Sequence, residues 1–228
     1  AYALRENTTA KFNTAVGACS LYANTTGANN IGVGYQALKN NTTACNNTAV
    51  GTQSMLYTQT GNHNTAIGKS SLQNNSTGGQ NTASGYRALL SNTTGSNNTG
   101  SGFYSLKTNT TGALNTASGA YSLLLNTTAN FNTAYGACSL YANTTGTDNT
   151  AVGYRALCAN TTGALNTASG QFSMRGNSTG TENTASGYMA LCTNTTASFN
   201  TAFGSRALRV NTTGACNDAV GWCALTTN

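Results

Sequence analysis

The sequence predicts an all-β fold: a parallel β-solenoid, either a β-roll or a β-helix, in which one 17-residue repeat makes one coil. An Asn-Thr-Ala-x-Gly motif recurs every 17 residues without an insertion or deletion. Small and variable side chains alternate within this motif, as they do in strands. No apolar stripe with a period of 3.6 residues occurs, and Asn, Thr and Gly are poor helix formers. The motif begins at Asn13, Asn30, Asn47, Asn64, Asn81, Asn98, Asn115, Asn132, Asn149, Asn166, Asn183, Asn200 and Asn217.

The first element expected in each coil is a short strand over the motif, for example over residues 13–17. With the opening Asn as position one, the side chains of positions one, three and five point to one face, and those of positions two and four point to the other. The first set is Asn, a small residue and Gly, whereas position four accepts residues as different as Val16, Ser84 and Tyr135. We therefore expect the first face to be tightly packed.

A bend near the Gly of position five leads to the one large apolar column, position nine, which is Leu except at Met55 and Met174. We expect these side chains to stack as the core. The Asn-Thr-Thr-Gly segment of positions twelve to fifteen predicts a second short strand between turns, because Asn tolerates left-handed backbone and can bond its own turn. Stacked Asn side chains can also bond one another along the axis. The ladder residues of two representative repeats are Asn13, Gly17, Leu21, Asn24 and Thr26, and Asn149, Gly153, Leu157, Asn160 and Thr162.

Residues 1–228 are expected to form a single repeat array of about 13.4 coils, which is 228 residues divided by 17. No atypical capping repeat is visible, so we interpret the chain as an excerpt of a longer solenoid. One Leu per coil is a small core against an ordering cost of about 1.5 kcal/mol per residue. We therefore predict self-association, as a homotrimer or a filament, in which the Gly and Ala columns let the backbones of neighbouring chains approach closely.

The stretch Asn-Thr-Ala-Val-Gly-Tyr-x-Ala-Leu-x-x-Asn-Thr-Thr-Gly, from Asn149 to Gly163, resembles repeats of bacteriophage and bacterial tail-fibre-domain proteins. Its first half is similar to the Ala-Ile-Gly-type repeats in the heads of trimeric autotransporter adhesins. The resemblance covers the whole chain and implies a left-handed parallel β-roll assembled as a trimer. The adhesin repeats are shorter than 17 residues, so a two-sided roll and a three-sided coil both remain open. The sequence contains no C-terminal trimerisation or chaperone domain, so the trimeric state and the handedness rest on the resemblance alone.

Side chains that could support catalysis are sparse, since only 6% of the residues are charged. The four acids are far apart along the chain, and the single histidine, His63, occupies the variable position seventeen, where we expect it to be exposed. No paired carboxylates, nucleophile with a base, or zinc-ligand spacing can be assembled, so we predict no catalytic, metal or cofactor-binding residues and no cofactor. The seven cysteines fall in four columns and imply no disulfide ladder; we interpret them as small apolar fillers.

Basic and aromatic side chains share one edge of the predicted coil, on or beside the bend. Nine of the ten Lys and Arg residues occupy positions six, seven and ten, and aromatic residues recur at positions six and seven. Such side chains can stack on sugars and pair with anionic groups. The charges are too sparse for nucleic acid, so this edge faces solvent, a neighbouring chain or surface polysaccharide. The candidate contact residues are Tyr35, Tyr86, Arg87, Tyr154, Arg155, Tyr188, Arg206 and Trp222.

Two further columns admit a binding or modification role. The Thr of position fourteen forms an unbroken rank of the kind that can match an ice lattice, but position thirteen is expected to point to the opposite face and so cannot supply a second rank. The Asn of position twelve matches the N-glycosylation acceptor pattern in all repeats but one. If these Asn side chains form an internal ladder, they cannot carry glycans, and we expect that structural role.

The function we predict is that of a non-enzymatic structural shaft of a phage tail fibre or surface adhesin, which positions a distal receptor-binding region. Its expected location is extracellular, on a cell surface or on a virion surface. The alternatives are a self-assembling extracellular filament and an ice- or glycan-binding repeat array. No apolar run is long enough for membrane insertion.

Overall fold

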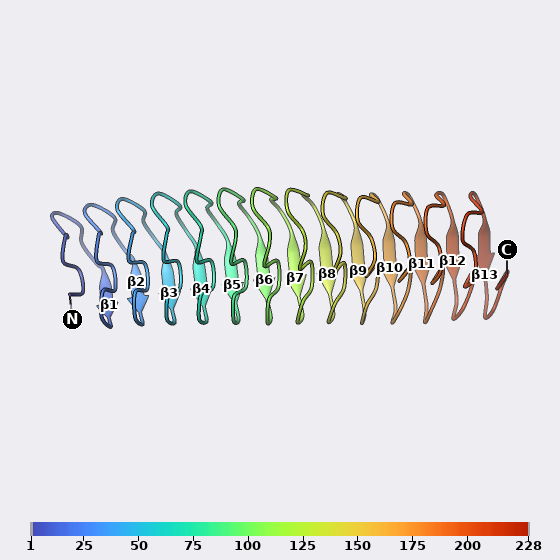
Figure 1. Cartoon of the computed structure of the whole chain (residues 1–228), viewed down its shortest axis with the longest axis horizontal. Helices are drawn as coiled ribbons and strands as arrows, with labels where there is room; N and C mark the ends of the chain where they lie inside the picture. Colours follow the sequence, from blue (N-terminus) through green and yellow to red (C-terminus); the bar gives the residue numbers. More distant parts are fainter. Residues whose placement is uncertain (1, 228) are drawn as a thin grey trace. The chain divides into compact units, whose positions relative to one another are not determined.

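The computed structural model describes residues 2–227 and confirms the all-β parallel solenoid with a 17-residue coil (Figure 1). All regular elements in the described residues are strands. The chain divides into two compact units, unit 1 (Ala1–Leu114) and unit 2 (Asn115–Asn228). The same coil is repeated within each unit.

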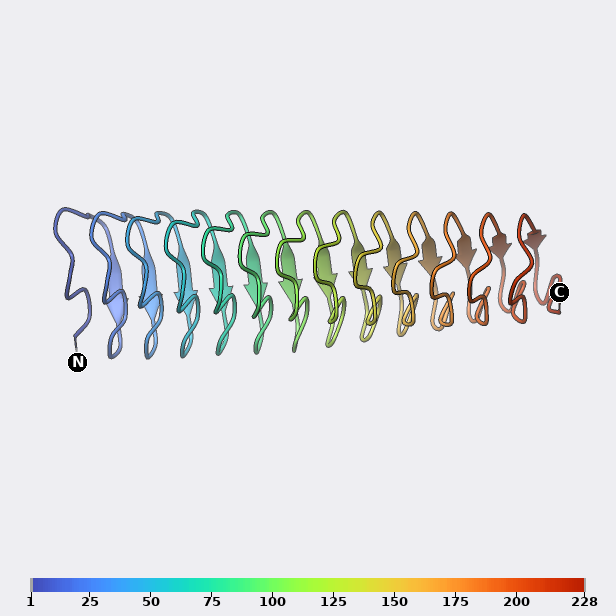
Figure 2. The same cartoon turned by 45° about the horizontal axis from the view of Figure 1, so that its top comes forward.

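Each strand covers positions two to four of its repeat, which confirms the first predicted element. Within each unit, consecutive strands lie side by side and point the same way (Figures 1 and 2). Their register advances by one repeat, so that Ala15 lies opposite Gly32 in unit 1 and Ala117 opposite Ala134 in unit 2. The strands of unit 1 are β1 (Thr14–Val16), β2 (Ile31–Val33), β3 (Thr48–Val50), β4 (Thr65–Ile67), β5 (Thr82–Ser84) and β6 (Thr99–Ser101). Those of unit 2 are β7 (Thr116–Ser118), β8 (Thr133–Tyr135), β9 (Thr150–Val152), β10 (Thr167–Ser169), β11 (Thr184–Ser186), β12 (Thr201–Phe203) and β13 (Asp218–Val220).

The core of each coil lies between the strand and the opposite side of the coil, and it is built from the predicted columns. The Ala of position three is buried, for example Ala49, while the residues of position four face outward, as Val16 and Ile67 do. The Leu column is confirmed as the apolar ladder. Its fully buried members are Leu21, Leu38, Met55, Leu72, Leu89, Leu106, Leu123, Leu140, Leu157, Met174, Leu191 and Leu208.

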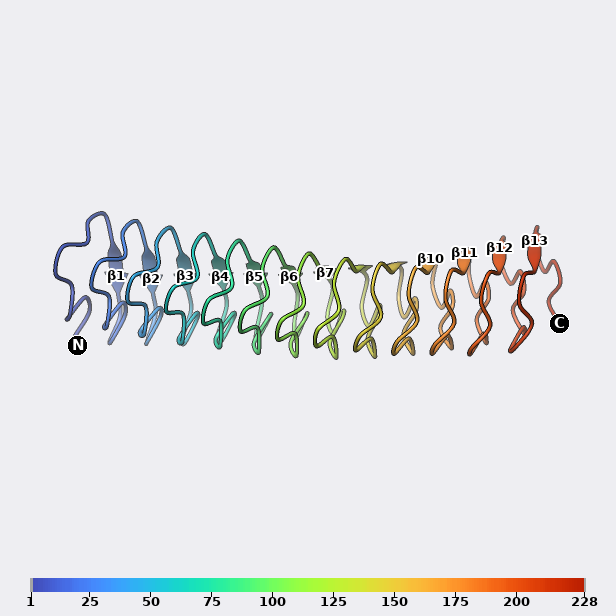
Figure 3. The ribbon, with the colours of Figure 1, turned by 90° about the horizontal axis from the view of Figure 1, so that it is seen from above.

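The predicted second strand at positions twelve to fifteen is wrong, because this segment is a bend. Its backbone still bonds to the next coil: the amides of Thr25 and Thr26 both donate to the carbonyl of Thr42, at 2.9 and 3.2 Å. Sharing one carbonyl is incompatible with the evenly spaced bonds of a parallel ladder. In each unit the strands therefore line one side of the coils, and strand-free loops line the other (Figure 3).

Left-handed backbone occurs in columns other than the Asn columns where it was expected. In the repeats that begin at Asn13 to Asn200, positions seven, nine and seventeen have positive φ, as in Cys19 (57°), Leu21 (48°) and Asn29 (59°), whereas Asn13 and Asn24 do not. L residues pay about 1–2 kcal/mol for this conformation, and β-branched residues are the least suited to it. Consistently, the residues with positive φ in these columns include no Val, Ile or Thr.

Two ladders of buried Asn side chains run through each unit, as predicted. At position one, Asn30 donates from its backbone N–H to Asn13 Oδ1 at 2.8 Å and from its side chain to the carbonyl of Ala44 at 2.8 Å. At position twelve, Asn41 Nδ2 donates to Asn24 Oδ1 at 2.7 Å and to the same Ala44 carbonyl at 3.1 Å. The carbonyl of position fifteen is thus held by both ladders, which ties the two sides of the coil together.

The Gly and Ala columns pack within one chain. This corrects the expectation that they let the backbones of neighbouring chains approach closely. A Cβ atom on Gly17 (φ 118°) would lie 2.7 Å from the carbonyl oxygen of Gly34 in the next coil. The position-three Ala side chains lie inside the coil. The Gly column therefore allows the close spacing between successive coils of one chain, and the Ala column fills the interior of each coil. Self-association stays a prediction that rests on the small core alone.

Candidate functional site

The aromatic-basic edge, defined as positions six, seven and ten, lies where the chain leaves the strand. The Gly of position five adopts φ values that L side chains rarely adopt, such as 130° at Gly85, and turns the backbone away from the strand. At position six, Tyr35 is 50% exposed and Trp222 is 75% exposed. At position seven, Arg155 is exposed, Arg87 and Arg206 are half-buried, and Ser70 is buried. The fold therefore places the predicted edge residues on the outside of the coil.

In unit 1, a compact cluster forms around Tyr86 and Arg87. The ring of Tyr86 stacks on that of Phe103 with centroids 5.4 Å apart, and Phe103 meets Tyr104 edge to face at 4.3 Å. The Arg87 guanidinium lies 5.1 Å from the Tyr86 centroid and donates to the Tyr104 hydroxyl at 3.3 Å. Lys107 Nζ lies 4.7 Å from the Tyr104 centroid. Both cations gain cation–π stabilisation from this arrangement.

In unit 2, the same pairing recurs over three successive coils. The Tyr154 ring meets Phe172 at 5.4 Å, and Phe172 meets Tyr188 at 6.4 Å, both edge to face. One guanidinium lies over each ring, and that of Arg155 is 5.4 Å from the centroid of the Tyr154 ring. The other two pairs are Arg175 over Phe172 at 5.6 Å and Arg206 over Tyr188 at 6.0 Å. Of the predicted edge residues, the structure thus groups Tyr154, Arg155, Tyr188 and Arg206, while Tyr35 and Trp222 belong to neither cluster.

The positive charge of this edge is largely uncompensated. In residues 2–227 the single ion pair joins Arg5 and Glu6, which are both about half exposed. The remaining acids, Asp148, Glu182 and Asp218, are exposed and occupy positions seventeen and two, away from the edge. An anion approaching either cluster would therefore meet cations that no carboxylate already occupies.

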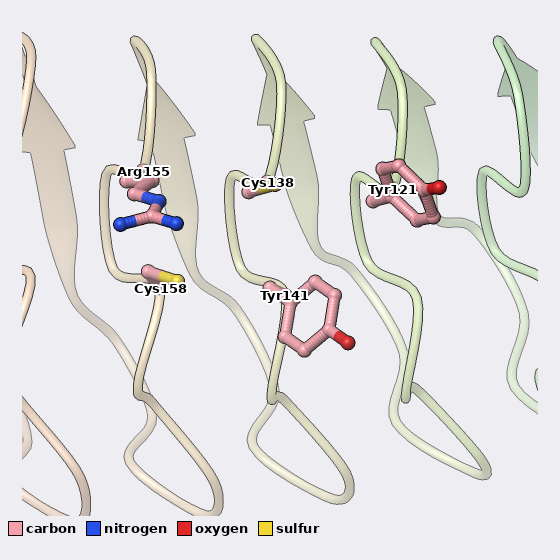
Figure 4. A pocket seen from close by; sticks show the side chains of 5 residues that line it. All are labelled: Tyr121, Cys138, Tyr141, Arg155 and Cys158. Carbon is pink, nitrogen blue, oxygen red and sulfur yellow. The ribbon is translucent and has the colours of Figure 1, made fainter.

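A cavity of about 440 Å³ opens on the edge in unit 2, lined by Tyr121, Cys138, Tyr141, Arg155 and Cys158. These side chains come from the three coils that follow β7, β8 and β9, and Figure 4 shows Cys138 between Tyr121 and Arg155. The sequence identified Arg155 as a contact residue, but it identified neither cysteine nor Tyr141 as part of a site. The sequence signal that could have indicated this cavity is a small residue between two large ones at position seven of successive repeats.

The remaining polar side chains of the described chain do not assemble into a metal site. No group of three or more metal-ligating side chains lies together in residues 2–227. His63 is exposed, as predicted, with its Nε2 3.3 Å from Asn46 Nδ2. All seven cysteines are free thiols. The filler interpretation holds for the buried Cys192 and is wrong for Cys216, which is exposed.

The Asn and Thr columns of positions twelve to fourteen are those for which an ice-binding or glycosylation role was considered. Thr25 is half-buried and Thr26 is exposed. Because the segment is a bend, the strand alternation behind the expectation that these two side chains point to opposite faces does not apply. The Thr25 hydroxyl donates to the carbonyl of Thr42 at 3.0 Å and is thereby occupied. Asn24 is fully buried, and in that environment its side chain has no room for a glycan.

No known protein family, curated protein or solved structure matches this chain. The resemblance to tail-fibre and adhesin repeats therefore stays a prediction carried by the motif. In the part of the chain that the structure describes, no helix is suited to crossing a membrane.

Proposed function

We propose that the chain is a non-enzymatic structural shaft of an extracellular or virion-surface fibre or adhesin, which holds a distal receptor-binding region away from its base. The observation that supports this proposal is the uniform repeat: coils of identical length are bonded to their neighbours in one register throughout each unit. A repeat of this kind can be lengthened by whole coils without a new fold. Reach, which is what a shaft supplies, is then set by the number of repeats.

The bonds between coils suit the proposed role mechanically. Around one coil, the amide of Leu21 donates to the carbonyl of Ala37 at 2.9 Å, that of Ala23 to Lys39 at 2.9 Å, and that of Gln36 to Ala18 at 2.9 Å. The Asn ladders add side-chain bonds at the same interface. Because these bonds act in parallel, a pull along the axis must break them together, and a coil resists extension more than a chain of single contacts does.

The first experiment measures the assembled species and its location. Analytical ultracentrifugation is expected to give a discrete homo-oligomer, and immunogold labelling of the source cell or particle is expected to place the chain on its outer surface. Polymers of indefinite length would instead favour a self-assembling filament. Labelling confined to the cell interior would contradict the proposed role.

The second experiment tests reach. Deleting one whole repeat, residues 64–80, is expected to leave the fold intact and to shorten the end-to-end distance within unit 1 by about 4.8 Å, the spacing of paired strands. Deleting residues 64–71 should abolish folding, because it breaks the register of every ladder. Equal damage from both deletions, measured by circular dichroism and by distances between paired spin labels, would remove the basis for a length-adjustable shaft.

A further inference from the structure

The cavity in unit 2 exists because two columns of the edge each carry a small residue between large ones. Along position seven the order is Tyr121, Cys138 and Arg155, and along position ten it is Tyr141, Cys158 and Arg175. The two cysteines fall at neighbouring points of successive coils, so the two gaps merge into one hollow (Figure 4). Its volume of about 440 Å³ lies within the range of small-molecule sites, roughly 300–1,000 Å³.

The lining combines two aromatic walls with one available cation. Tyr121 is 37% exposed and Arg155 is exposed, so the cavity opens to solvent at the side where both lie. Arg155 rests on the Tyr154 ring at 5.4 Å and has no ion-pair partner in the described residues. A guanidinium held in this way presents a planar fork of donors that fits a carboxylate with two parallel hydrogen bonds.

Cys158, which lines the cavity, adds no negative charge at neutral pH. Burial raises the pKa of the Cys158 thiol, the nearby Cys138 adds to this, and Arg155 and Arg175 act in the other direction. Cys158 therefore stays a neutral thiol at neutral pH. An anionic ligand would meet one positive group, two tyrosine side chains and the neutral thiol of Cys158.

We propose that this cavity binds a carboxylate-bearing saccharide residue, with the carboxylate on Arg155 and the sugar ring between Tyr121 and Tyr141. Tyrosine offers an apolar ring face for the C–H side of a sugar and a hydroxyl for its polar rim. The opening to solvent lets a longer glycan continue out of the cavity on either side. The site is independent of the shaft role, since a shaft that binds no sugar remains a shaft.

Isothermal titration with tetragalacturonate, the probe, tests the proposal on the full chain. Arg155→Gln removes the cation from an exposed side chain and is expected to weaken binding at least tenfold. Cys138→Tyr fills the cavity and is expected to abolish binding. It should fold, because Tyr104 and Tyr121 occupy the same column at φ 57° and 59°, against 56° for Cys138.

Lys11→Gln in unit 1 is the matched control. It removes one exposed cation at position sixteen, outside the aromatic-basic edge, and it should leave affinity within twofold of the wild type. Maltotetraose, a neutral oligosaccharide of equal length, should bind at least tenfold more weakly than tetragalacturonate. The proposal is overturned if the wild type does not bind millimolar tetragalacturonate, if either cavity variant binds normally, or if benzoate competes as well as the sugar.

Discussion

The position-twelve Asn ladder is interrupted once in the middle of unit 1, at Thr58, and the interruption leaves two buried oxygen atoms without partners. Asn41 Oδ1 and Thr58 Oγ1 both belong to fully buried side chains and accept or donate no hydrogen bond. One coil earlier, the equivalent contact is the 2.7 Å bond from Asn41 to Asn24. Thr has no amide nitrogen with which to repeat it. The substitution Thr58→Asn should restore the ladder.

The expected gain follows from the bonds that the new side chain can make. Its amide N–H groups can donate to Asn41 Oδ1 and to the carbonyl of Gly61, as the neighbouring ladder members do, and its oxygen can accept from Asn75 Nδ2. Asn75 uses one N–H for Gly78 at 2.8 Å and has a second. Three bonds at about 0.5–1.5 kcal/mol each, less the cost of ordering one longer side chain, give a stabilisation of about 2–3 kcal/mol.

Guanidinium denaturation measures this change, and native-state hydrogen exchange localises it to the three coils around position 58. Thr43→Asn, the same exchange at an exposed position fourteen, should change stability by less than about 0.5 kcal/mol. The reverse change, Asn92→Thr, should destabilise by a similar 2–3 kcal/mol, since it removes the 2.8 Å bond to Asn75 Oδ1. The reasoning is refuted if Thr58→Asn brings no gain while Asn92→Thr is harmless.

Three further predictions concern single columns. Leu72→Ile should cost about 2 kcal/mol or more, because a β-branched residue is strained at φ 47°, while Leu72→Met should cost less than about 1.5 kcal/mol; equal losses in denaturant unfolding would contradict the strain argument. Gly85→Ala should cost about 2–4 kcal/mol, since its Cβ would lie 2.6 Å from the Gly102 oxygen, and a thermal midpoint equal to that of the wild type would disprove this. Alkylation of Cys158, followed by mass spectrometry, should reach half its maximal rate at a higher pH than free cysteine does, because burial raises its pKa and only the thiolate reacts; a midpoint at or below that of free cysteine would contradict it.

The fold was predictable because each structural position recurs in every repeat, so the sequence itself shows which residues that position accepts. The repeated occurrences of each position predicted that Leu21 and its equivalents are core and that Ala15 faces inward. The prediction of a second strand was wrong for a local reason. Strand alternation assumes extended backbone, but the side-chain Nδ2 of Asn24 donates to the carbonyl of Gly27, three residues on, at 3.0 Å. That side-chain bond competes with strand geometry and bends the segment.

The candidate site was predictable in part. The exposure of the edge follows from the bend after the strand, whereas the cavity in unit 2 depends on the backbone conformation of the loop that follows. Tyr154 and Arg155 are adjacent in sequence, so their pairing needs no tertiary information. Cys138 and Cys158 line one cavity because the fold brings positions seven and ten of successive coils together, in a segment where positions seven and nine are left-handed. The absence of β-branched residues from those two columns was a readable signal of that conformation.

The invariant length of the repeat is explained better by the buried Asn side chains than by the Leu core. A Leu column that slipped by one residue would still offer apolar contacts, since hydrophobic packing is non-directional. The backbone N–H of Asn30, in contrast, must meet Asn13 Oδ1 in the preceding coil, while its side-chain Nδ2 must meet the Ala44 carbonyl in its own coil. One inserted residue would leave such buried groups unpaired on both ladders, at about 1–3 kcal/mol for each group. Directional bonds in the interior thus make 17 residues the only coil length that the neighbouring coils accept.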